Sequence, residues 1–65
     1  MNRFIIVEVD GIIRSAICKD GKANKYGEPK IFKTLREAQK WIDKHSYAGM
    51  SFKYEIVEVN INGTE

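Results

Sequence analysis

A single cysteine, Cys18, and a single histidine, His45, most restrict how this chain of 65 residues can fold. A chain this short buries only about 60% of the surface that its unfolded form exposes, so small domains often rely on disulfides or a structural metal. One thiol and one imidazole build neither a disulfide framework nor a zinc site. We therefore expect one domain over residues 1–65, stabilised by a small apolar core and by self-association.

The composition is that of a folded domain, with 43% apolar and 31% charged residues. The first apolar run, from Phe4 to Val7, ends at Glu8 and is far shorter than a signal-peptide core or the roughly 20 residues of a membrane-spanning helix. We expect no membrane association. A lone cysteine favours a reducing compartment, so the expected location is cytoplasmic.

Two strands are predicted from a repeated phrase, Ile-Val-Glu-Val, at residues 6–9 and again at 56–59. Asp10-Gly11 between two Ile- and Val-rich runs predicts a hairpin of residues 3–9 and 12–19 with a type I′ turn. Two glycines, an asparagine and the only proline then predict a loop at 19–30, after which 30–32 could add a short strand.

A helix is predicted to begin at Thr34, because Glu37 three residues later completes a capping box. Ser46 to Gly49 reads as its end, and a last strand is expected from about Phe52 to Ile61. The fold class is α+β, a two-layer β-β-(β)-α-β arrangement with a mostly antiparallel sheet and one helix on one face. If the short strand forms, the last strand is expected beside the first and parallel to it.

Strand alternation divides the apolar residues between two faces of the sheet. If Val9 pairs with Ile12, the valines share one face, which we expect the helix to cover. The other face is then open and apolar, which indicates a surface for a homodimer or a partner protein. A bulge that shifts the hairpin register is the alternative. The residues of this expected interface are Phe4, Ile6, Ile13, Ile17, Tyr54 and Ile56.

Charge is unevenly distributed, with nine basic and four acidic residues between positions 14 and 44. Such a polarity can steer a partner, although a charge run more often only faces water. Tyr26 and the lysines of the 19–30 loop are the expected contacts for a protein partner. The alternative is a phosphate-binding stripe for nucleic acid, made of Lys22, Lys25, Lys30, Lys33, Arg36 and Lys40.

Catalytic chemistry finds little support in the sequence. Glu8 and Glu58 could lie side by side on adjacent strands as an acid–base or cation-binding pair, but no third ligand joins them. Cys18 and His45 could form a thiolate pair, although a small buried cysteine is the simpler interpretation. We expect no enzyme, no metal and no cofactor.

One segment, residues 30–42, resembles a known family. It is similar to the strand-to-helix junction of the arm-type DNA-binding domains at the N-termini of tyrosine recombinases. The matching residues are Phe32, Lys33, Thr34, Glu37, Ala38 and Trp41. The resemblance implies DNA binding and a phage or mobile-element origin. The residues themselves favour a small interaction module that binds a protein and self-associates, with nucleic-acid binding as the alternative.

Overall fold

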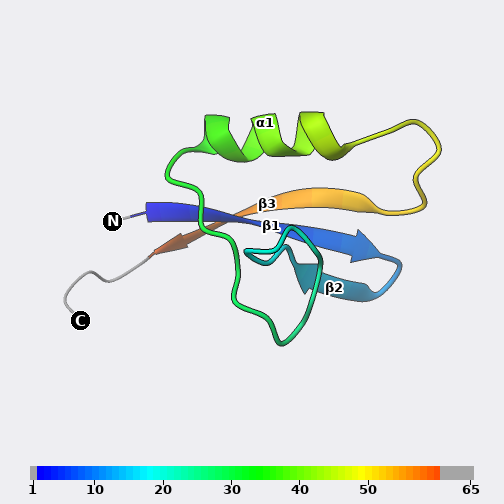
Figure 1. The fold of residues 1–65 in the computed structure, drawn as a ribbon, viewed down its shortest axis with the longest axis horizontal. Coiled ribbons are helices and arrows are strands. Elements are labelled where there is room, and N and C mark those ends of the chain that lie inside the picture. Colours follow the sequence, from blue (N-terminus) through cyan, green and yellow to red (C-terminus); the bar gives the residue numbers. More distant parts are fainter. Residues whose placement is uncertain (1, 61–65) are drawn as a thin grey trace.

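One helix packs on one face of a three-stranded sheet in this computed structural model, which describes residues 2–60 (Figure 1). The strand order is β2-β1-β3 and both neighbouring pairs are antiparallel. The predicted α+β class is therefore confirmed. The elements are β1 (Asn2–Asp10), β2 (Ile13–Ala16), α1 (Leu35–His45) and β3 (Lys53–Asn60).

The hairpin between β1 and β2 turns one residue later than predicted, because Asp10 itself pairs with Ile13. The loop residues are Gly11 and Ile12, and only Gly11 has a positive φ, of 63°. One positive φ at the first loop position is typical of a type II′ turn, whereas type I′ needs two. The predicted turn was wrong in type and position. Val9 pairs with Arg14, two residues beyond the expected partner Ile12, and a shift of two keeps each side chain on its predicted face.

The first half of β1 hydrogen-bonds to the segment that precedes the helix. Phe4 N–H donates to the Phe32 carbonyl at 2.9 Å, and Phe32 N–H donates to the Phe4 carbonyl at 2.8 Å. The short strand predicted at 30–32 is thus reduced to one antiparallel bridge. β2 and Phe32 occupy successive parts of the same edge of β1.

The direction of β3 corrects a prediction. β3 runs antiparallel to β1, with Ile6 opposite Ile56, and not parallel to it. The reason is where α1 begins: Phe32 holds the chain beside the start of β1, and the helix then runs along the sheet toward the hairpin (Figure 1). The connection after α1 reaches the hairpin end, so β3 must return toward the start of β1.

The predicted N-cap forms at Thr34, but the Glu37 carboxylate of the capping box bonds to the residue before the cap and not to Thr34 itself. Thr34 Oγ1 accepts a hydrogen bond from Glu37 N–H at 3.1 Å, and the Glu37 carboxylate accepts one from Lys33 N–H at 3.1 Å. The helix ends at His45, and the N–H of the C-cap Ser46 donates to the Ile42 carbonyl. Both ends of the helix are therefore set by local signals in the sequence.

Replacing Thr34 by alanine is expected to lower the free energy of unfolding by about 0.5–2 kcal/mol, because Glu37 N–H then lacks its acceptor. Thr34→Ser keeps the hydroxyl and serves as the control. Equilibrium denaturation in urea measures the difference. An alanine variant as stable as the serine variant would contradict the role of this cap.

The core lies between α1 and the face of the sheet that we expected to be open. Ile6 and Ala38 are 0% exposed and Ile17 is 1% exposed, and Phe32 is buried with them. The prediction that the helix covers the valine face was wrong. The covered face presents larger side chains, so covering it removes more apolar area from water.

The opposite face of the sheet carries the valines and is crossed by an ion pair. Arg14 Nη2 on β2 lies 2.9 Å from Glu55 Oε1 on β3, with β1 between the two strands. In the register Val7 lies between Ala16 and Glu55, and Val7 is 9% exposed without a helix over it. The long Arg14 and Glu55 side chains thus shield aliphatic surface while their charged ends stay in water.

Cys18 is buried by the loop that follows β2. Its Sγ lies 3.4 Å from the Asn24 carbonyl oxygen and 3.6 Å from that of Ala16. Gly27 packs directly against this thiol, since a Cβ at position 27 would lie 2.6 Å from Sγ. A glycine is needed here because of close approach and not because of backbone conformation.

Gly27→Ala is expected to push the loop off Cys18, lowering stability and exposing the thiol. The rate of labelling by a thiol reagent should rise well above that of the unmodified protein. Combining Gly27→Ala with Cys18→Ala removes Sγ, so the two stability losses should be less than additive. Additive losses together with an unchanged labelling rate would contradict this contact.

Candidate interaction site at the hairpin end

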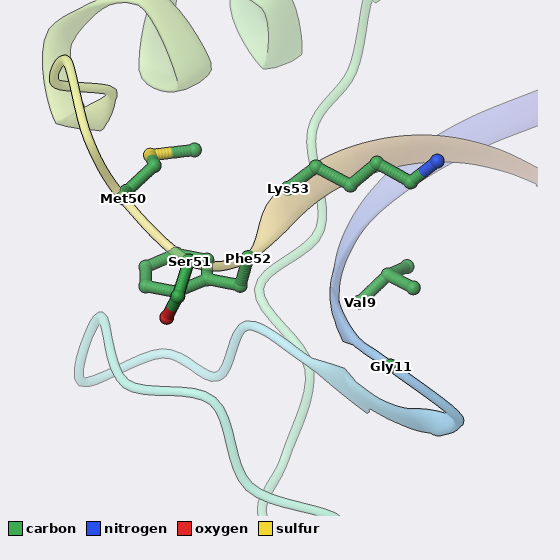
Figure 2. Close-up of a pocket in the computed structure, with 6 residues that line it drawn as sticks. All are labelled: Val9, Gly11, Met50, Ser51, Phe52 and Lys53. Atoms are coloured by element: carbon green, nitrogen blue, oxygen red, sulfur yellow. The ribbon is translucent and has the colours of Figure 1, made fainter.

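The structure has an open hollow of about 430 Å³ where the hairpin turn meets the connection between α1 and β3. Val9 and Gly11 border it from the hairpin, and the second wall is the segment from Met50 to Lys53 (Figure 2). It is a surface depression open to solvent and not an enclosed small-molecule pocket. Its walls come from segments about 40 residues apart in sequence, so only the folded chain contains it.

Large apolar side chains are exposed at this same end. Ile12, next to Gly11 in the turn, is 99% exposed, and Ile13 is 53% exposed. Tyr47, which follows the helix, is 61% exposed, and its ring packs edge-on against Phe52 with centroids 6.5 Å apart. We call the following residues the hairpin-end patch: Val9, Ile12, Ile13, Tyr47, Met50 and Phe52.

A chain of aromatic contacts connects this patch to the core. Phe52 meets Tyr54 edge-on at 5.4 Å, and Tyr54 meets Trp41 edge-on at 5.2 Å. Trp41 in turn stacks on His45 at 3.9 Å, and His45 Nδ1 lies 2.8 Å from the Trp41 carbonyl oxygen. Edge-on aromatic pairs stabilise beyond the area they bury. The contacts therefore hold the second wall of the hollow in place.

The pKa of the Tyr54 phenol is affected by its surroundings at this end of the sheet. Tyr54 lies directly across from Glu8 in the pairing of β1 with β3. Burial raises the pKa of the Tyr54 phenol above its ordinary value of 10.0, and the negative charge of Glu8 adds to the rise, as does Tyr47. The phenol therefore keeps its proton to a higher pH than a fully exposed tyrosine does.

The raised pKa predicts how stability depends on pH. The folded state holds the Tyr54 proton more tightly than the unfolded state, so this contribution is complete below pH 10.0 and is lost as the pH rises through the higher folded-state pKa. Glu8→Gln should lower the pKa of Tyr54 toward its ordinary value. Phenolate absorbance against pH measures this, with Tyr54→Phe as the control. An unchanged titration in Glu8→Gln would contradict the electrostatic contribution.

The residues expected to form an open interface are mostly inside the protein. Ile6 and Ile17 are buried in the core, and Phe4, Tyr54 and Ile56 pack partly buried around them. Ile13 is the exception, at 53% exposure. The expected dimer face is therefore corrected: α1 covers it, because the core of this small domain needs the Phe and Ile side chains.

The structure does not bring the six basic candidates together as one stripe. Lys33, Arg36 and Lys40 are exposed at or on α1, whereas Lys22 and Lys25 lie in the loop after β2, which is bridged to Ile17 and Cys18. Lys30 is half-buried, with Nζ 5.8 Å from the centre of the Phe32 ring. The set thus divides into a helix part and a loop part.

The two candidate chemical pairs are separated. Glu8 lies opposite Tyr54, whereas Glu58 lies opposite Phe4, so the carboxylates occupy different levels of the sheet. Glu58 instead accepts a hydrogen bond from the Asn2 side chain. Cys18 is buried against the loop at Asn24, whereas His45 stacks on Trp41 of the helix, so the two side chains have different neighbours. Within residues 2–60, no group of three or more His, Cys, Asp or Glu side chains is placed to hold a metal ion.

Comparisons with known proteins add no relatives: no protein-family model, curated protein or solved structure matches the chain. The resemblance of residues 30–42 to recombinase arm-binding domains therefore stays a prediction. Over the part of the chain that the structure describes, no helix is long and apolar enough to cross a bilayer.

Sequence reasoning missed Ile12 and the hollow. Ile12 was expected to pair with Val9 as part of a strand, but the structure places it in the turn. The sequence did contain a signal for an exposed isoleucine. Two consecutive isoleucines follow Asp10-Gly11 directly, so one of them must lie at or near the turn. The hollow had no sequence signal, since its walls meet only through the path of α1.

Proposed function

We propose that this protein is a small, non-enzymatic interaction module that binds a protein partner through the hairpin-end patch. The observation that carries the proposal is Ile12, 99% exposed at a hairpin tip beside a hollow of about 430 Å³. Burying an isoleucine side chain stabilises by about 1.5–3 kcal/mol. A partner that covers Ile12 therefore gains this amount from a single residue.

The form of the patch supports a protein as its occupant. Aromatic and methionine side chains are enriched where proteins bind one another, and Tyr47, Met50 and Phe52 lie together at this end. The polar rim of such a site is supplied by Lys53 and Asp10, both exposed. Tyr26 in the loop, 94% exposed, is a second accessible contact. A cytoplasmic location is part of the proposal and is favoured by the free, buried Cys18.

Nucleic-acid binding is the second candidate, and one observation favours it. Arg36, Lys40 and Lys44 recur every four residues along α1 and are all exposed. Three phosphate contacts on duplex DNA would give a log–log salt slope of about −2.7. The loop lysines lie apart from this row, so the expected binding is weak and indifferent to sequence.

The test of the proposed function uses two isoleucines that are both exposed but lie at opposite ends of β1. A photo-crosslinking residue at position 12 should capture one protein partner in cells, whereas the same residue at position 31 should not. With the purified partner, Ile12→Asp should weaken binding about tenfold or more, because a charge replaces the apolar contact. Ile31→Asp, at a residue 44% exposed, is the matched control.

Two results would overturn this assignment. One is equal capture from positions 12 and 31, which would mean that the patch has no special role. The other is tight, sequence-selective binding of a duplex DNA probe in fluorescence anisotropy that persists at physiological salt, lost in Lys40→Glu and kept in Ile12→Asp. That result would assign the function to the helix.

A further inference from the structure

The backbone hydrogen bonds of β1 show which groups of β3 face outward. Phe4 N–H and C=O both bond to Phe32, and the Ile6 carbonyl accepts from Ile17 N–H. The backbone N–H and C=O groups of the even-numbered residues of β1 are therefore directed away from β3. In an antiparallel ladder the groups alternate between the two edges. The odd-numbered residues of β1 therefore bond to β3, as Ile5 does to its partner Val57.

It follows that the even-numbered residues of β3 direct their N–H and C=O groups to the outer edge of the sheet. Tyr54, Ile56 and Glu58 present this row, and within residues 2–60 no other strand lies beside it. The opposite edge is different, because the Ala16 carbonyl on β2 already accepts from Asn24 N–H in the loop. β3 is also eight residues long and contains neither proline nor glycine. Such an edge is a template for another strand.

We propose that the outer edge of β3 pairs with β3 of a second copy of this chain, antiparallel, to form a six-stranded sheet. A twofold axis perpendicular to the sheet makes the contact self-complementary. This pairing goes beyond the proposed function, because it uses the side of the sheet and not the hairpin end.

Register and charge select how the two strands meet. With Ile56 opposite its own copy, Tyr54 lies opposite Glu58 of the other chain, so these three residues exchange hydrogen bonds across the contact. A register displaced by two residues leaves part of the row unpaired, and in one direction it sets Glu55 directly opposite Glu55. Like charges in that position are destabilising. Hydrogen bonding and charge repulsion along β3 therefore both favour the register centred on Ile56.

The helix fits the same arrangement. Trp41 on α1 packs against Tyr54 on β3, so this flank of the helix faces the pairing edge. α1 packs on residues of both β1 and β3, including Ile6 and Ile56. The two helices of a dimer would then lie on one face about two strand spacings apart, roughly 9–10 Å. Packed helices lie about 8–10 Å apart. Pairing therefore covers the half-buried Trp41.

The experiment removes a single outward N–H. The chain of 65 residues is within reach of chemical synthesis with ligation at Cys18, which allows N-methylation of the backbone at Ile56. Arg14 supplies the matched control, because its N–H points outward from the opposite edge of the sheet. Sedimentation velocity up to about 1 mM and the emission of Trp41, the only tryptophan, follow association.

We expect the unmodified chain to dimerise with a concentration-dependent blue shift of Trp41 emission. N-methylation at Ile56 should weaken the dimer about tenfold or more, since it removes two symmetry-related hydrogen bonds, and N-methylation at Arg14 should not. A monomer at about 1 mM, or equal weakening by both modifications, would overturn the proposal.

A second variant keeps the proposal testable if the N-methylated chain does not fold. In a Cys18→Ala background, Ile56→Cys places two thiols directly opposite each other, at a separation that a disulfide spans. It should oxidise to a covalent dimer much faster than Arg14→Cys, and equal rates would count against β3 pairing. Ile12→Asp should leave the dimer intact, so failure of the hairpin-end patch and failure of β3 pairing are distinguishable.

Discussion

The reciprocal hydrogen bonds between Phe4 and Phe32 are the interaction on which the rest of the fold depends. They place the chain beside the start of β1 just before the helix begins, on the part of the edge that β2 leaves open. α1 then has one direction available along the sheet, and it delivers the chain to the hairpin end (Figure 1). The antiparallel return of β3 and the hollow beside Gly11 both follow from this placement.

The apolar side chains on the two faces of the sheet are shielded from water in different ways. Both faces are apolar at their centres, but a chain of this length supplies only one helix among its described residues. α1 covers the face with Ile6, and the Arg14–Glu55 ion pair crosses the face with Val7. An exposed ion pair contributes little free energy by its charges alone. Its value here lies in the alkyl stems, which help to shield Val7 from water.

The two proposed contacts use different parts of the same fold. The hairpin-end patch lies where the strands turn, and the outer edge of β3 runs along the side of the sheet. Tyr54 connects the two, because its ring contacts Phe52 of the patch while its backbone faces the open edge. A dimer through β3 would therefore hold two patches in a fixed relation, and each would remain free for a partner.

The sequence by itself determined the features that depend on near neighbours. Gly11 marked the hairpin, Thr34 with Glu37 marked the start of the helix, and alternation sorted residues into the correct two sets. The tertiary structure decided which of the two sets of side chains the helix covers, in which direction β3 runs, and that the Ile12 side chain is exposed to solvent. The physical reason is that a period of two records which side chains share a face but carries no information about what packs on it. The larger side chains around Ile6 favour the covered face. The direction of β3 follows from a pairing between residues 28 positions apart, Phe4 and Phe32, which no local pattern encodes.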